Sequence, residues 1–119
     1  MNFDAKIPIY LQIIEMIKKE IIVGIREKGE KLPSVREMAA SLKVNVNTIQ
    51  RAYQELEREK VTFTERGKGS FVTQEEEVVL RIKKEMANEM LKNFIEGMKE
   101  IGYSYEEIIK VVKEEMKED

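Results

Sequence analysis

Apolar side chains recur every three or four residues along most of the chain, and this spacing predicts amphipathic helices. The first predicted helix begins at Pro8 and ends near Gly24, because proline favours helix starts and glycine favours helix ends. A broad apolar face runs along this helix, so we expect it to support the core of a small domain. The residues of that face are Ile9, Leu11, Ile13, Ile14, Ile17, Ile21 and Ile22.

Two further helices joined by a tight turn are predicted within residues 32–56. Ser34 is placed to cap the first of them, and Glu37 three residues later completes an S-x-x-E capping box. Val44 breaks the helical phase, and Asn45 is a suitable cap for the second helix. The pair has predicted core positions at Met38, Ala39, Leu42, Val44, Ile49, Ala52, Tyr53 and Leu56.

A β-hairpin is predicted directly after these helices. Residues 61–64 alternate like a strand, the turn Gly67-Lys68-Gly69 follows, and residues 70–73 form the second strand. Helix, turn, helix and hairpin in this order predict a winged helix-turn-helix over residues 1–73. The predicted fold class is mainly α with a small β-hairpin.

The second of the two short helices has a polar face opposite its buried stripe. Its side chains are short or planar hydrogen-bonding groups, which suit the edges of bases and the oxygens of phosphates. A helix that needed only solubility would more often carry Lys and Glu. Double-stranded DNA is therefore the expected partner of this face, which consists of Asn47, Thr48, Gln50, Arg51 and Gln54.

Three separate motifs resemble the DNA-binding domain of GntR-family transcription regulators. They lie at residues 29–39, 45–57 and 67–72, and the N-x-N-T-x-x-R-A-Y-x-x-L-E form of the second resembles the YtrA subfamily. The opening residues 8–13 also match that subfamily. The resemblance covers about residues 7–73. It implies a homodimeric repressor on a two-fold operator, with control of a transporter operon.

The resemblance and the polar face together give a set of expected DNA contacts. Arg36 matches an arginine that the family places on DNA, although a solvated surface arginine is the alternative. Arg51 could instead pair with Glu55 four residues later, and the 67–69 turn could be a plain β-turn. The expected DNA-binding residues are Ser34, Arg36, Asn45, Asn47, Thr48, Gln50, Arg51, Gly67, Lys68 and Gly69.

Two residues depart from the family pattern, and two others near the start of the chain are candidates for further contacts. Lys60 stands where the family usually has a glycine with positive φ, so we expect either backbone strain there or a different turn. Val46 stands where the subfamily often has proline. Tyr10 and Lys6 remain candidates for contact with a phosphate or a partner subunit.

Composition removes several kinds of chemistry. The 119 residues include no cysteine and no histidine, so we expect no thiolate or histidine catalysis, no cofactor and no metal site. Residues 1–73 hold 13 Lys and Arg against 10 Asp and Glu, whereas residues 74–119 hold 8 against 13. A basic DNA-binding region followed by an acidic C-terminal segment suits a DNA-binding protein. No apolar run has the length of a membrane span, and a cytoplasmic location is expected.

Residues 74–119 predict a helical dimerisation tail. Two amphipathic helices are expected, the first interrupted by Gly97 and ending at Gly102, the second opened by a capping box of Ser104 and Glu107. So short a helical pair cannot bury its own apolar stripe. A second copy is the expected cover, with packing on the winged helix or an unknown effector pocket as alternatives. The expected dimerisation residues are Ile82, Met86, Met90, Phe94, Met98, Ile108 and Val112.

Two other functions compete with that of a DNA-binding regulator. Some GntR relatives carry a pyridoxal-phosphate aminotransferase-like domain, but only 46 residues follow the predicted wing, so this reading requires the chain to be a fragment. A winged helix that mediates only protein contact should have an apolar or acidic recognition helix, which this chain lacks. Binding to genomic DNA fragments would distinguish a DNA-binding regulator from a winged helix that mediates only protein contact.

Overall fold

The computed structural model describes residues 2–117 as five helices and one hairpin, in two compact units that divide at Lys83. Helices and strands follow one another in an order typical of a winged helix. The elements are α1 (Ile9–Ile22), α2 (Val35–Leu42), α3 (Val46–Arg58), β1 (Thr62–Glu65), β2 (Gly69–Val72), α4 (Glu76–Glu100) and α5 (Tyr105–Met116). None of the helices among the described residues is long and apolar enough to span a membrane.

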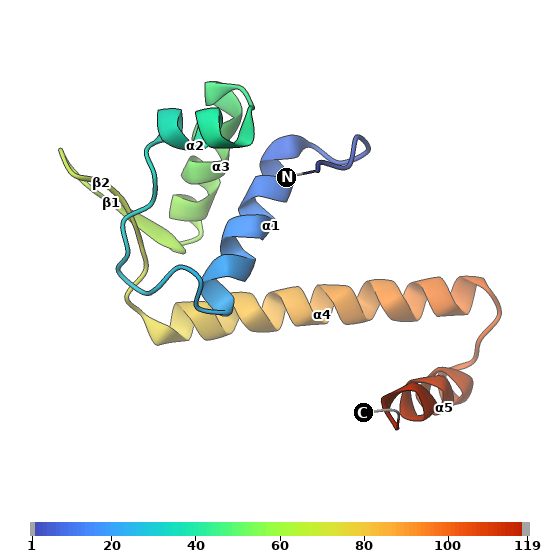
Figure 1. Ribbon diagram of the computed structural model, residues 1–119. Coiled ribbons are helices and arrows are strands. Elements are labelled where there is room, and N and C mark those ends of the chain that lie inside the picture. The colour runs from blue at the N-terminus through green and yellow to red at the C-terminus, as the bar shows by residue number, and fades with distance from the viewer. Residues whose placement is uncertain (1, 118–119) are drawn as a thin grey trace. The chain divides into compact units, whose positions relative to one another are not determined.

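The core of the first unit lies between α1, α2 and α3 (Figure 1). Ile13 and Ile17 of α1 are fully buried, as are Ile49 and Leu56 of α3. The helical periodicity of the sequence placed all four on the buried faces. Leu42 and Val44, at the junction of α2 and α3, were also expected in the core, but they pack against it only half-buried.

Side-chain caps determine where α2 and α3 begin. The Ser34 hydroxyl accepts a hydrogen bond from the Glu37 amide at 3.1 Å, and the Glu37 carboxylate accepts one from the Ser34 amide at 2.8 Å. This reciprocal capping box confirms the sequence prediction. The Asn45 side chain accepts from the amide of Asn47 at 2.7 Å and caps α3. Between these helices, Lys43 adopts a left-handed conformation with φ of 58°, which the sequence did not predict.

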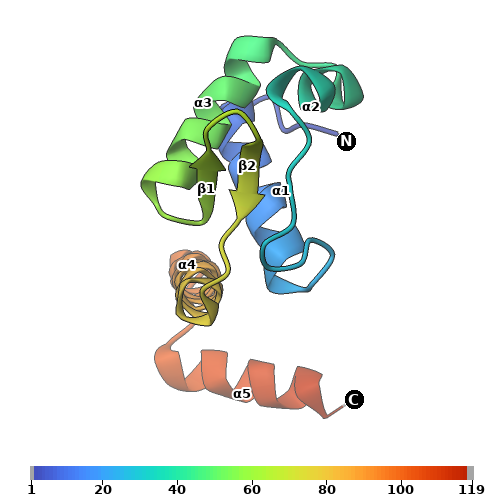
Figure 2. The ribbon, with the colours of Figure 1, turned by 90° about the vertical axis from the view of Figure 1, so that its left-hand side faces the viewer.

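The two strands of the hairpin lie antiparallel (Figure 2). Phe63 lies opposite Phe71 in their register. These two rings stack with their centroids 5.6 Å apart. Val72 at the end of β2 is fully buried, and an isolated bridge joins Phe71 to Lys31 in the segment before α2. The predicted hairpin is therefore present, with its strands shifted by one residue.

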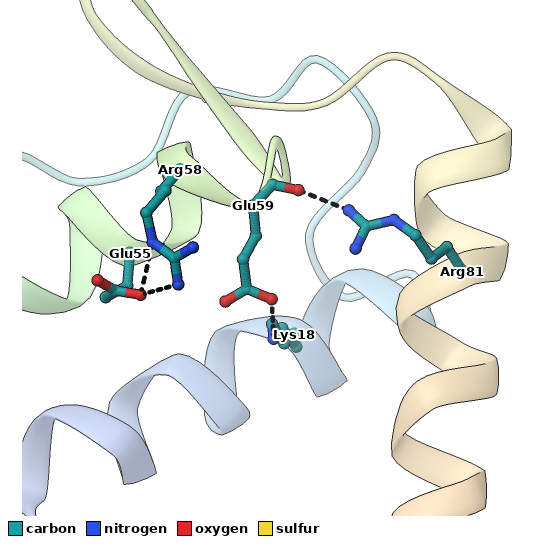
Figure 3. Close-up of polar contacts among 5 residues, drawn as sticks. All are labelled: Lys18, Glu55, Arg58, Glu59 and Arg81. Carbon is teal, nitrogen blue, oxygen red and sulfur yellow. Dashed lines mark hydrogen bonds and ion pairs between the residues drawn. The ribbon is translucent and has the colours of Figure 1, made fainter.

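The C-terminal end of α3 is fastened to both α1 and the start of α4 (Figure 3). The Lys18 ammonium of α1 lies 2.9 Å from the Glu59 carboxylate, and both side chains are largely buried. The Arg81 guanidinium donates to the backbone carbonyl of Glu59. Because α3 ends at this point, Arg81 satisfies a carbonyl that the helix itself leaves unpaired. The next residue, Lys60, has a φ of 65°, so the expected backbone strain is present there.

The first two turns of α4 belong to the first unit. Ile82 is fully buried, and Val79 is 9% exposed in the same apolar cluster as Ile17 and Leu56. The compact units consequently divide ten residues later than the expected boundary at 73/74. Ile82 was expected at a dimer interface, but its side chain is already covered within the single chain.

The second unit consists of the rest of α4 and α5. Helix α4 continues through Gly97 without the predicted interruption, whereas Gly102 has a φ of 96° and follows its end. Ser104 and Glu107 form the predicted second capping box. Ile108 is 5% exposed and therefore covered within the chain, although it was expected at the dimer interface.

Candidate nucleic-acid interface

Helix α3 separates an apolar face from a hydrogen-bonding face. Ile49, Ala52 and Leu56 are fully buried, whereas Asn47 and Gln50 are exposed. Thr48, also predicted to contact DNA, is half-buried. Amide side chains of this type form paired hydrogen bonds with adenine in the major groove. The exposed face of α3 therefore offers donors and acceptors along one side of a helix that fits a major groove.

Tyr53 fixes α3 against the segment that precedes α2. Its hydroxyl donates to the carbonyl of Pro33 at 2.7 Å. Burial raises the pKa of Tyr53 to about 12, so the hydroxyl stays protonated and remains a donor at neutral pH. This contact joins α3 to the segment before α2, through a residue whose ring was predicted to lie in the core.

Arg51 lies on the exposed face, but its partner is not the one that spacing suggested. Its Nη2 atom donates to the hydroxyl of Tyr10 in α1 at 3.1 Å, and its Cζ atom lies 3.8 Å from the centre of that ring. Glu55, the alternative partner, pairs with Arg58 at 2.6 Å. The Arg58 guanidinium lowers the pKa of Glu55 and therefore keeps it ionised.

The start of α2 presents Ser34 and Arg36. Arg36 is exposed, and no partner for its guanidinium is found among residues 2–117. Hydrogen bonds from Ser34 lower the pKa of Glu37, so the capping box includes a carboxylate at neutral pH. The Ser34 hydroxyl oxygen accepts within this cap and keeps its proton for another acceptor. Asn45 is similarly occupied through its oxygen and keeps its two amide N–H donors.

The wing brings a lysine between two glycines to the end of the hairpin. Gly67 and Gly69 have φ values of 78° and 121°, which favour glycine, and Lys68 between them is exposed. The Lys68 ammonium lies 3.8 Å from the Glu65 carboxylate, so its charge is partly offset. A side chain at residue 69 would approach the stem of Lys31 at 3.0 Å. The end of the Lys31 side chain therefore lies against the backbone of the wing.

An open groove of about 390 Å³ lies between the wing and the start of α2. Lys31, Ser34, Glu37, Lys68 and Gly69 contribute to its lining. Lys31 was not among the predicted contacts, because its proximity to the wing comes from a bridge to Phe71, forty residues further along the chain. The sequence signal that could have pointed to it is its place in the motif at residues 29–39, directly before Leu32.

The predicted DNA-binding residues divide into three groups in space. Asn45, Asn47, Thr48, Gln50 and Arg51 lie on α3 or at its cap, Ser34 and Arg36 at the start of α2, and the remaining three at the wing tip. Within the described residues 2–117, no group of three or more carboxylates is arranged to hold a metal ion. The donors are amides, hydroxyls, guanidinium groups and ammonium groups, the types that contact bases and phosphates.

Fold and surface together define a winged helix-turn-helix DNA-binding domain. The sequence model of the bacterial regulatory proteins of the gntR family matches residues 9–72. The chain therefore belongs to the GntR family. This match spans α1 to β2, which includes every element that carries a predicted DNA contact.

Similar proteins extend the comparison into the tail. The chain is 43% identical over 112 residues to the HTH-type transcriptional regulator YhcF of Bacillus subtilis, covering 94% of this chain and 93% of that protein. It is 40% identical over 108 residues to the HTH-type transcriptional repressor YtrA of the same organism, covering 90% and 83%. The resemblance to YtrA-type regulators is thus confirmed.

A solved structure is similar over most of the chain. A GntR family transcriptional regulator from Listeria monocytogenes superposes with a TM-score of 0.86 at 43% identity, covering 94% of this chain and 98% of that one. The chain is accordingly a DNA-binding transcription regulator and not an enzyme, and it matches these relatives over nearly their full length.

Proposed function

We propose that this regulator is a homodimeric repressor that recognises a two-fold operator, with α3 of each copy in the major groove of one half-site. The observation that carries the proposal is the exposed row of Asn47, Gln50 and Arg51 opposite the fully buried Ile49 and Ala52. Repression is supported by the similarity to a protein named as a repressor.

The proposed contacts divide into base readout and phosphate binding. Asn47, Thr48 and Gln50 read base edges, because Asn47 and Gln50 are exposed on the face of α3 that points away from the core and the half-buried Thr48 lies beside them. Charged, capping and glycine positions hold the DNA backbone, since ammonium, guanidinium and bare backbone groups are suited to phosphate oxygens. The residues of the second group are Ser34, Arg36, Asn45, Arg51, Gly67, Lys68 and Gly69, joined by Lys31.

A comparison of two duplexes tests base readout. Gln50→Ala should weaken binding to the operator by about 1–3 kcal/mol and change binding to a random duplex little, because only the operator offers the base that Gln50 recognises. Gln74→Ala is a control at an exposed glutamine that lies outside α3 and outside the proposed contacts. Equal losses on both duplexes for Gln50→Ala would exclude base readout at this position.

The tail is proposed as the homodimer interface. Met90 and Phe94 of α4 are 53% and 41% exposed, and Ile101 is 71% exposed, although these residues are apolar. Exposed apolar stripes of this kind mark interaction sites. A second copy of the chain is the simplest partner for this stripe, because a two-fold operator requires two DNA-binding domains. The proposed interface keeps Met86, Met90, Phe94, Met98 and Val112 and leaves out the covered Ile82 and Ile108.

Sedimentation of a charged variant tests the interface. Phe94→Glu should convert the full chain to a folded monomer, whereas Lys92→Glu, an exposed change on the same helix, should leave the dimer intact. A dimer of unchanged affinity in the Phe94→Glu variant would remove α4 from the interface.

An effector, if the regulator has one, is proposed to act through the tail. Residues 1–73 contain no histidine or cysteine that could sense a signal. The distance between the two DNA-binding domains of a dimer must match major grooves about 34 Å apart. A ligand that favours one arrangement of the tail would therefore alter DNA affinity. The apolar residues near Gly97 are the proposed ligand site: Met86, Met90, Phe94 and Met98.

Replacement of the tail tests this proposal. Residues 1–83 joined to an unrelated rigid dimeriser of matching geometry should bind the operator and ignore the natural inducer. Continued release of DNA by that chimera would place the sensor elsewhere. A cytoplasmic location and control of a transporter operon complete the proposed function, and mapping of bound sites in cells would test the second.

A further inference from the structure

Arg51 is held by two contacts that come from one tyrosine of another helix. Tyr10, at the second residue of α1, accepts a hydrogen bond from Arg51 Nη2 at 3.1 Å. The same ring lies under the guanidinium, with the Cζ atom 3.8 Å from its centre, well inside the range of a cation–π interaction. Tyr10 is half-buried and packs against the core cluster, so the ring itself has a fixed position.

These contacts leave most of the guanidinium available. The hydrogen bond to the Tyr10 hydroxyl uses a single N–H of the guanidinium. The other N–H donors lie on the edges of the plane and have no further partner within residues 2–117. An arginine that is already oriented loses less side-chain freedom when a ligand binds than one that moves freely.

The direction in which Tyr10 draws Arg51 favours a particular ligand group. Tyr10 belongs to α1, so the guanidinium is turned from the exposed face of α3 toward the flank of that helix. A recognition helix in a major groove has bases in front of it and phosphates along its flanks. The contact therefore fits a backbone phosphate better than a base edge.

A purely structural purpose explains the pair less well. Helices α1 and α3 already pack through Ile13, Ile17 and Ile49, and the partly buried ion pair of Lys18 with Glu59 joins them further along. The Arg51 side chain is exposed, and polar contacts of exposed side chains add little to the free energy of unfolding.

We propose that Tyr10 is a positioning residue that orients Arg51 to bind a phosphate of the DNA backbone. This inference rests on the proposed function, in which Arg51 faces DNA. Tyr10 does not supply charge. It holds the charge of Arg51 at one place before DNA arrives.

Binding of the full chain to a random-sequence duplex tests the inference, because a phosphate contact acts on any sequence. Fluorescence anisotropy measures the affinity at several salt concentrations for Tyr10→Phe and Tyr10→Leu, each with Arg51 and with Arg51→Ala. Arg58→Ala is the matched control, since Arg58 is an exposed arginine of α3 already paired with Glu55. Thermal unfolding of each variant confirms that it is folded.

The expected result is that the effect of Tyr10→Leu on DNA affinity depends on the presence of Arg51. Arg51→Ala should lower the affinity and reduce the salt slope by about 1, which marks the loss of one phosphate contact. Tyr10→Leu should lower the affinity about 3- to 10-fold with Arg51 present, keep the salt slope, and have no effect in the Arg51→Ala background. Tyr10→Phe should fall between Tyr10→Leu and the unaltered chain.

Three results would overturn the inference. Equal losses from Tyr10→Leu in both backgrounds would mean that Tyr10 acts without Arg51. An unchanged affinity in Tyr10→Leu, with a loss in Arg51→Ala, would mean that Arg51 needs no positioning, and the proposed interface would still hold. An unchanged affinity in Arg51→Ala would remove Arg51 from the proposed interface as well.

Discussion

The first two turns of α4 should stabilise the DNA-binding unit, and Ile82→Ala removes their most deeply buried side chain. Ile82 is 0% exposed and belongs to the same apolar cluster as Ile13, Ile17 and Leu56. Leu80, two residues earlier on the same helix, is 56% exposed and provides a matched control. The two substitutions remove similar side chains from opposite faces of one helix.

The expected cost follows from this difference in burial. Truncating a fully buried isoleucine to alanine costs about 2–5 kcal/mol, because transfer energy is lost and a cavity remains. Truncating an exposed leucine changes the free energy of unfolding by roughly 0.5 kcal/mol or less. Ile82→Ala should therefore be less stable than Leu80→Ala by at least about 1.5 kcal/mol.

Urea unfolding of the full chain measures the difference, with every sample at one protein concentration so that any association contributes equally. The unfolding midpoint should move to lower urea in Ile82→Ala and stay close to its original value in Leu80→Ala. Equal midpoints for the two variants would refute the assignment of the start of α4 to the first unit.

Three further predictions concern other parts of the same unit. Lys60→Gly should stabilise the protein by about 0.5–1 kcal/mol, because a left-handed conformation costs lysine about 1–2 kcal/mol and glycine loses about half of that gain to entropy. Lys83→Gly, within α4, should instead destabilise it by about 1 kcal/mol, and thermal unfolding distinguishes the two signs. Lys68→Ala should weaken operator and random DNA alike and reduce the salt slope by about 1, so a loss confined to the operator would contradict a phosphate contact. Ser34→Ala should cost about 1 kcal/mol at neutral pH. The pKa of Glu37 is lowered from 4.5, so the stability that its carboxylate contributes to the capping box is present above pH 4.5 and is lost as the pH falls through the lowered pKa. The difference in free energy of unfolding between Ser34→Ala and the unaltered chain should therefore become smaller in acid.

Local signals explain what the sequence predicted well. The capping boxes of Ser34 with Glu37 and of Ser104 with Glu107 depend on residues three positions apart, and both are present. Helical periodicity likewise identified the buried face of α3, and alternation with two glycines identified the hairpin. Each of these features is determined within a few residues of the chain, so no knowledge of distant segments was needed.

The features that the sequence did not predict depend on residues that are far apart. Tyr10 meets Arg51 across 41 positions, and nothing in the spacing of α3 distinguishes Tyr10 from Glu55 as its partner. Ile82 has the same periodicity as Met86 and Met90, but only the position of the first unit's core decides that Ile82 is covered. Lys43 takes a left-handed conformation because the turn between α2 and α3 requires one, although lysine has no preference for it.

Footprinting on the protein's own promoter tests the central claim, which is sequence-specific reading by α3 of a dimer. Hydroxyl-radical cleavage should show two protected regions on one face of the duplex, centred about one helical turn, or 34 Å, apart. Gln50→Ala should need about 5- to 160-fold more protein to give the same protection, which corresponds to a loss of about 1–3 kcal/mol. A single protected region, or equal protection by the Gln50→Ala variant, would contradict the account.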